Sequence, residues 1–146
     1  SYTNGLLSKL KNPNGWLRAA EIKLLEESGR AFRDEVDPTS NQAWADLSDT
    51  TKNIRGKKGK WPGGKLQVDG GLKRSITTSS SNTPFGGTAT IGSNLVYATT
   101  HFFGAKRHAF GKRTPWGDIP ARPFLGISDV AQKELADDIS RLIDSN

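Results

Sequence analysis

The sequence lacks cysteine and methionine, and it contains only two histidines. Without cysteine there can be neither a disulfide bond nor a thiolate metal site, so cysteine usage does not indicate a redox compartment. No apolar run approaches the roughly 18 residues that a membrane-spanning helix requires, so we expect no membrane contact. Residues 1–11 also lack the apolar core of a signal peptide. A small chain without disulfide bonds fits an intracellular protein.

Residue patterns of known catalytic sites are missing as well. Neither His101 nor His108 has an acidic neighbour at metal-ligand spacing, so a zinc site would need carboxylates from scattered positions. Asp137 and Asp138 are adjacent and point in different directions around a helix, so they cannot act as a catalytic pair. The glycine pairs lack the phosphate-loop pattern, and the serine run has no nucleophile-elbow context. We therefore predict no enzymatic activity, no metal and no cofactor, and we interpret His101 as a partly buried structural residue.

Positive charge is abundant and unevenly distributed. The net charge is +6 and the isoelectric point is near 9.7, which favours a polyanionic partner. One basic stretch contains Lys52, Arg55, Lys57, Lys58, Lys60, Lys65, Lys73 and Arg74, and a second contains Lys106, Arg107, Lys112 and Arg113. The C-terminal segment is acidic by contrast. A basic region and an acidic end suit head-to-tail assembly as well as nucleic-acid binding.

Two amphipathic helices are predicted near the ends of the chain. The first spans residues 13–36, with Asn12 as its N-cap, apolar residues at spacings of three and four, and a Glu26–Arg30 pair on its solvent side. Asp37 and Pro38 would end this helix. The second follows Ser128, a favourable N-cap, and continues to residue 144.

The middle of the chain predicts a small sheet between irregular segments. We expect a short helix at 48–54, a mobile basic loop at 55–65, strands at 72–79 and 88–92 joined by a turn at 80–87, and a helix at 94–103 closed by Gly104. The basic loop with Trp61 could bind phosphate and stack on a base, or it could become ordered only on assembly. The outline is a single α+β domain over residues 1–146: a small antiparallel sheet packed against a long N-terminal and a C-terminal helix, with long basic loops.

Residues 119–126, with the sequence Ile-Pro-Ala-Arg-Pro-Phe-Leu-Gly, form the most distinctive segment, which we call the strap. Pro120 and Pro123 restrict the backbone, so the strap should be extended and stiff. In one interpretation it is a rigid connector in which Phe124 anchors the last helix. In the other, Arg122 is held in a fixed direction to contact a partner, at little entropic cost.

A series of landmarks along the chain resembles a known family. The landmarks are Asp37-Pro38, Trp44-x-x-Leu47, Leu66-x-x-x-Gly70-x-Leu72-x-x-Ser75-Ile76, Ile91-Gly92, Val96-Tyr97-Ala98-x-x-His101-x-Phe103-Gly104 and the strap. The series resembles the phage virion morphogenesis (tail completion) family of the Mu G and P2 S type. The resemblance covers nearly the whole chain, and the strap is its most specific part.

This resemblance implies a non-enzymatic virion protein of a tailed phage or prophage that completes the tail or joins it to the head at the neck. It implies self-association into a ring, commonly sixfold, around the DNA passage, together with tail and neck or connector proteins as partners. Such a protein would be made in the host cytoplasm and end in the virion. The candidate partner surface is Pro120, Arg122, Pro123 and Phe124. The candidate residues for non-specific contact with packaged DNA, or with a partner, are Arg55, Lys57, Lys58, Lys60, Lys106, Arg107, Lys112 and Arg113. The alternative is a free-standing basic nucleic-acid-binding module.

Overall fold

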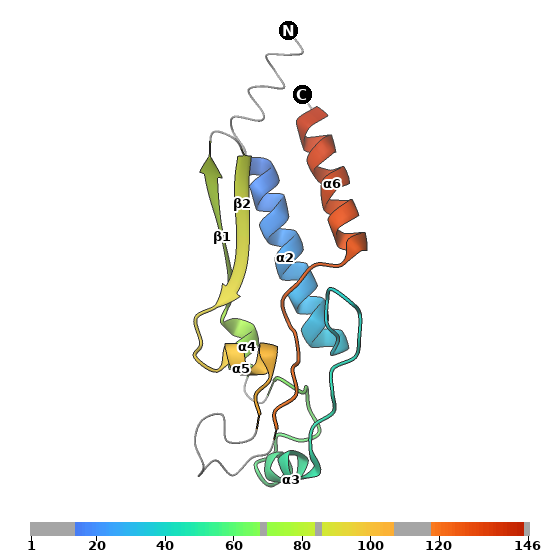
Figure 1. Ribbon diagram of the computed structural model, residues 1–146, viewed down its shortest axis with the longest axis vertical. Coiled ribbons are helices and arrows are strands. Elements are labelled where there is room, and N and C mark those ends of the chain that lie inside the picture. Colours follow the sequence, from blue (N-terminus) through green and yellow to red (C-terminus); the bar gives the residue numbers. More distant parts are fainter. Residues whose placement is uncertain (1–13, 68–69, 84–85, 107–117, 145–146) are drawn as a thin grey trace.

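The computed structural model describes residues 14–67, 70–83, 86–106 and 118–144. Its elements are α2 (Asn14–Asp34), α3 (Asp49–Lys57), α4 (Gly71–Arg74), β1 (Ile76–Thr83), β2 (Gly86–Ser93), α5 (Ala98–Phe103) and α6 (Asp129–Asp144). The long helix α2 lies between the β1–β2 hairpin and α6 in the upper part of Figure 1. The short helices α3, α4 and α5 lie in its lower part. The α+β architecture predicted from the sequence is confirmed.

Helix α2 buries one face along most of its length. Leu17, Ala31 and Phe32 are buried, as the helical spacing of apolar residues predicts. The helix ends at Asp34, before the predicted stop, because Glu35 adopts a left-handed conformation with φ of 57°. Asn12, the predicted N-cap, lies outside the described residues.

The two strands form an antiparallel hairpin in continuous register, from Ile76 opposite Ser93 to Thr83 opposite Gly86. Along β2, Ala89 is partly buried while its neighbours Thr88 and Thr90 are exposed, which is the predicted alternation. Both strands reach further toward the connection than the sequence indicates. Helix α3 is longer than the sequence indicates. It begins after Ser48 as expected, but it continues to Lys57.

The prediction that a strand begins at residue 72 is wrong. Residues 71–74 form the helical turn α4, and β1 begins only at Ile76. Gly70 turns the chain with φ of 76°, and Leu72 is then buried in the core rather than on a sheet face. The burial of Leu72 determines this local structure, and it depends on packing that strand propensity does not include.

The main core lies at the C-terminal half of α2. The Phe32 ring packs against Trp44 and Phe124 at centroid distances of 5.8 and 5.6 Å, and Phe102 packs edge-on against Phe124 at 5.7 Å. Ala31, Leu66, Leu72 and Ala98 complete this cluster. Segments far apart in the sequence therefore meet at Phe124. Among the described helices, none combines the length and the apolar character needed to cross a bilayer.

Candidate assembly surfaces: the strap and the basic tip

The strap is extended, as its two prolines predict, and it is held at both ends. At its start Ile119 forms an antiparallel bridge with Ala105, with backbone N–O distances of 2.7 and 2.9 Å. At its end Gly126 has φ of 152°, and a Cβ at that position would collide with the side chain of Thr39. Only glycine therefore fits where the strap turns toward α6.

Arg122 is the most buried cation of the described residues, with 5% of its surface exposed. Its Nε donates to the carbonyl of Ala45 and its Nη2 to the carbonyl of Asp46, both at 2.8 Å. Its backbone N–H donates to the carbonyl of His101, also at 2.8 Å. The planar fork of the guanidinium suits two neighbouring acceptors in this way. Burial, followed by the nearby charge of Arg55, lowers the pKa of Arg122.

Two further hydrogen bonds connect the strap backbone to the core. The indole N–H of Trp44 donates to the carbonyl of Pro123 at 2.7 Å, and the hydroxyl of Ser28 donates to the carbonyl of Phe124 at 2.9 Å. Phe124 itself is 1% exposed. The strap thus links α2, the segment before α3 and the end of α5, and we call this set of contacts the strap joint.

The strap joint favours the connector interpretation for Arg122 and Phe124, because both side chains point inward. Pro120 is exposed and Pro123 is partly exposed. Contact between the strap and another protein stays a prediction, and in this structure it would be made by the two prolines rather than by the arginine.

The predicted mobile loop at 55–65 is in part helical and is anchored by Arg55. This residue lies near the end of α3 and donates to the carbonyls of Gly64 and Lys65 at 2.9 and 2.7 Å. Burial lowers its pKa. Lys65 is also engaged, since its amine donates to the carbonyl of Trp44 at 3.2 Å. The segment is therefore closed into a defined turn, contrary to the expectation from its glycine and lysine content.

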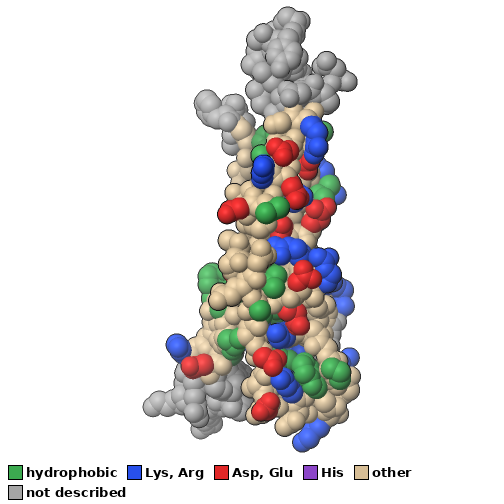
Figure 2. All heavy atoms as spheres, turned by 90° about the vertical axis from the view of Figure 1, so that its right-hand side faces the viewer, with side chains coloured by type: hydrophobic (Ala, Val, Ile, Leu, Met, Phe, Trp, Pro, Cys, Tyr) green, Lys and Arg blue, Asp and Glu red, His purple; other side chains and the backbone are tan. Residues whose placement is uncertain are grey.

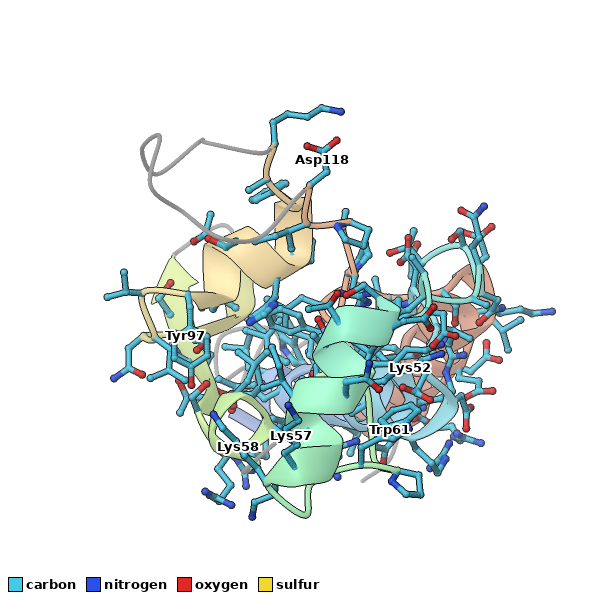
Figure 3. The ribbon with its side chains drawn as sticks, turned by 90° about the horizontal axis from the view of Figure 1, so that it is seen from below. Lys52, Lys57, Lys58, Trp61, Tyr97 and Asp118 are labelled. Atoms are coloured by element: carbon cyan, nitrogen blue, oxygen red, sulfur yellow. The ribbon has the colours of Figure 1, made fainter. Side chains whose placement is uncertain are left out.

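Lys57, Lys58 and Lys60 are exposed at and just after the C-terminal end of α3, and we call them the basic tip. Figure 3 shows the first two of these lysines beside α3. Across the described residues, none of their side chains takes part in an ion pair or hydrogen bond. Trp61 lies on another side of α3, where the amine of Lys52 sits 5.6 Å from the ring centroid. Lys52 also pairs with Asp46 at 2.7 Å, which raises the pKa of Lys52. Within the described part of the chain the three tip lysines are thus unpaired, whereas Lys52, Arg55 and Lys65 have internal contacts.

The second predicted basic group is described only in part. Lys106 is exposed and pairs with Asp118 at 3.8 Å. Arg107, Lys112 and Arg113 lie outside the described residues, so the structure does not place them relative to the basic tip. Lys73 and Arg74 are exposed on α4.

His101 is partly buried, as expected, whereas His108 lies outside the described residues. Its Nδ1 is buried and has no hydrogen-bond partner among the described residues. Burial lowers the pKa of His101, and the positive charges of Arg122 and Arg55 lower it further. Burial and both positive charges therefore disfavour the protonated imidazole. In the described part of the chain, no group of three or more acidic or histidine side chains is arranged to hold a metal ion.

The face that carries α6 mixes acidic and basic side chains (Figure 2). Lys23 of α2 pairs with Glu134 of α6 at 3.0 Å. Glu26 pairs with Lys23 at 3.5 Å rather than with Arg30, and Arg30 pairs with Glu27 at 2.7 Å. The Glu26–Arg30 prediction is therefore wrong.

Glu27 is buried because it connects two helices. It accepts hydrogen bonds from Arg30 and from the hydroxyl of Ser128, the latter at 3.1 Å. The same Ser128 hydroxyl accepts from the backbone N–H of Ala131 at 3.1 Å and so caps α6, as predicted. The helical spacing alone places Glu27 on the solvent side, so sequence reasoning missed this contact.

Comparison with known proteins agrees with the landmarks of the sequence. The profile described as the phage virion morphogenesis family matches residues 2–144. The chain belongs to this family. It is also 32% identical over 126 residues to the "Putative capsid assembly protein G" of Escherichia phage Mu, across 86% of this chain and 76% of the Mu protein. No solved structure is similar enough to count as a match.

Membership of the virion morphogenesis family gives this chain a role in assembling a phage virion. The residues that carry the resemblance have a clear structural position. Trp44, Arg122 and Phe124 belong to the strap joint, and Leu72 belongs to the same core. These four landmark residues therefore serve the fold, whereas the landmarks Val96 and Phe103 are exposed and the basic tip is not among the landmarks.

Proposed function

We propose that this virion morphogenesis protein completes the tail or joins it to the head at the neck, as a ring around the DNA passage. The observation that carries the proposal is the basic tip: three exposed lysines that have no ion-pair or hydrogen-bond partner among the described side chains, at one end of an elongated protein of a virion assembly family. In a ring, the tips of successive copies would line one rim. Such a rim would neutralise phosphates without reading sequence, or it would contact an acidic surface of a neighbouring virion protein.

The overall charge layout supports the same proposal. The basic tip and the acid-containing helix α6 lie at opposite ends of the molecule (Figure 1). A ring requires that two different surfaces of each copy meet, and complementary charges at separate positions help to orient successive copies. The Mu relative is named for capsid assembly, which is compatible with a position next to the head.

The proposal is tested by electron microscopy of an induced lysate in which the gene is deleted. We expect full heads separated from tails, or tails of abnormal length. Complementation with Lys57→Gln/Lys58→Gln/Lys60→Gln should restore far fewer joined particles than the wild-type gene does. Arg18→Gln/Arg33→Gln/Lys133→Gln removes the same charge from exposed positions on α2 and α6 and serves as the matched control. Normal numbers of infectious particles from the deletion would refute the role.

A nucleic-acid-binding module is the second candidate function, because both the basic tip and Trp61 lie beside α3, although on different sides of it (Figure 3). This candidate requires binding of DNA by the purified chain with a steep salt dependence. Each phosphate contact adds about 0.9 to the slope of log K against log salt concentration, so the tip triple variant should lower the slope by up to about 2.7. Any protein of this charge binds DNA weakly, so a change in slope that is common to both variants would reflect overall charge alone. An equal slope of log K against log salt concentration for the tip variant and the control variant would therefore exclude this candidate.

A further inference from the structure

A long central part of the chain carries no charge. From Ser75 to Ala105 there is no Asp, Glu, Lys or Arg, although charged residues make up 25% of the sequence. This stretch supplies the whole β1–β2 hairpin and α5. Depletion of charged residues marks the centre of protein interfaces. The described residues of these three elements form what we call the uncharged surface.

The hairpin has two strand edges available for pairing. Across the described residues the sheet contains only β1 and β2, and neither outer edge is joined to a further strand. In an antiparallel strand, about half of the backbone N–H and C=O groups point away from the partner strand. Ser80, Ser81 and Asn82 are exposed in succession, so this part of β1 is open on both faces.

Edge strands are usually protected from such pairing. Lysine, proline, a bulge or a covering segment are the common devices. Here the register has no bulge over its whole length, and the described strand residues include no charge and no proline. A two-stranded hairpin is also of marginal stability by itself. Pairing with another strand would satisfy the open backbone groups of β1.

The uncharged surface continues from the hairpin onto α5. Phe103 is 72% exposed and Val96, just before α5, is 94% exposed. A pocket of about 270 Å³ lies between the end of β2 and α5, and Phe102 and Phe103 line it. Exposed apolar side chains next to an open strand edge offer both side-chain burial and backbone pairing to one partner.

We propose that β1 of one copy pairs with β2 of the next copy, with the uncharged surface buried between them. This inference rests on the proposed ring and names the contact that would build it. The two edges belong to strands of equal length and similar chemistry, so each copy supplies both halves of the contact. A second copy is therefore the partner that the hairpin fits.

The connectivity of the hairpin allows the contact to repeat. Because β1 and β2 run in opposite directions, rotation about an axis along the strands brings β2 of the next copy beside β1 in antiparallel orientation. The contact uses two different edges and is therefore heterologous, which is the type that closes into rings. Pairing of β1 with β1 would instead give a closed dimer.

Engineered cysteines test which strands meet, and the absence of native cysteine makes the result unambiguous. Ser79→Cys places one thiol on an exposed position of β1, and Thr90→Cys places one on an exposed position of β2. The two residues are opposite each other within one hairpin. A short bismaleimide linker is added to each single variant and to their mixture, both as purified protein and in virions that carry both genes. Cross-linked dimer should form in the mixture and be at least tenfold weaker for either variant alone. Cross-linking of Ser79→Cys with itself, or no dimer in any sample, would overturn the proposal.

Lysine on the strand edge supplies an independent test. Thr77→Lys/Ser81→Lys adds two charges at exposed positions of β1, while Gln132→Lys/Ser140→Lys adds them on the exposed side of α6. By sedimentation and in virion complementation, we expect at least a tenfold loss of assembly for the β1 variant alone, with an unchanged circular dichroism spectrum. Rings that form normally with the β1 variant would refute the hairpin contact and leave the ring intact. A single copy of the protein per virion would refute the ring and the hairpin contact together.

Discussion

Replacement of Arg122 by alanine separates the two interpretations of the strap. In the structure the guanidinium makes two hydrogen bonds of 2.8 Å to the carbonyls of Ala45 and Asp46. Hydrogen bonds of charged groups contribute about 1.5 to 3 kcal/mol each. Ala45 and Asp46 are exposed, so water can reach their carbonyls when the arginine is removed, and the smaller values apply. We expect Arg122→Ala to lower the free energy of unfolding by about 3 kcal/mol.

A loss of this size is readily measured. For a chain of this length it corresponds to a fall in Tm of roughly 10 °C. Urea unfolding followed by tryptophan fluorescence measures this loss, and Trp44, whose indole bonds to the strap, is one of the four tryptophans that contribute to the signal. Arg122→Lys keeps the charge but loses the planar fork, so it should fall between the wild type and the alanine variant. Lys133→Ala removes an exposed charge from α6 and should change stability by less than about 0.5 kcal/mol.

The opposite result would refute the connector interpretation. If Arg122→Ala unfolds like the wild type but yields fewer joined particles, then the arginine acts on a partner and the buried position in the free chain is not its working position. Loss of stability with a matching loss of particles would instead trace the defect to folding.

Three other changes test contacts elsewhere in the fold. Phe124→Ala leaves a cavity among the core rings and should cost about 3 to 5 kcal/mol in urea unfolding; a cost below about 1 kcal/mol would place the ring outside the core. Ser128→Ala removes the cap of α6 and a partner of Glu27, and should cost about 1 to 2 kcal/mol; if so, hydrogen exchange of the first turn of α6 will also accelerate. Because the pKa of His101 is lowered in the folded chain, the unfolded chain binds more protons, and stability should fall as pH decreases below about 6.5. His101→Gln should flatten this dependence between pH 7.5 and 5.5, and an equal slope in both proteins would contradict the assignment.

Elements with a periodic pattern could be predicted from the sequence. The apolar spacing of α2, the Ser128 cap of α6 and the alternation along β2 all depend on neighbouring residues, so local reasoning is sufficient. Gly104 likewise ends α5 with φ of 75°, as expected. Where tertiary contacts decide the conformation, the sequence pattern was insufficient. Leu72 is the example, because its burial turns residues 71–74 into a helix.

In the candidate sites, too, the sequence pattern was insufficient where tertiary contacts decide the position of a side chain. Counting charges places Arg55 and Arg122 with the lysines as outward-facing cations, yet both arginines donate to backbone carbonyls inside the molecule. Charge alone does not distinguish these roles. The difference lies in the side chain, since guanidinium is less strongly hydrated than ammonium and binds two acceptors in one plane. In a basic stretch of this kind, lysines are the better candidates for contact with an external anion.

The buried residues that carry the family resemblance and the basic tip have different tasks, although other landmark residues, such as Val96 and Phe103, lie on the surface proposed for assembly. The landmark residues Trp44, Arg122 and Phe124 hold the strap joint together. The basic tip and the uncharged surface are constrained instead by whichever copy or virion protein lies against them. Exchange of residues 57–60 with those of the Mu relative should therefore preserve stability while changing the efficiency of joining. A strap exchange that breaks the Arg122 contacts should do the reverse, lowering stability first and assembly only as a consequence.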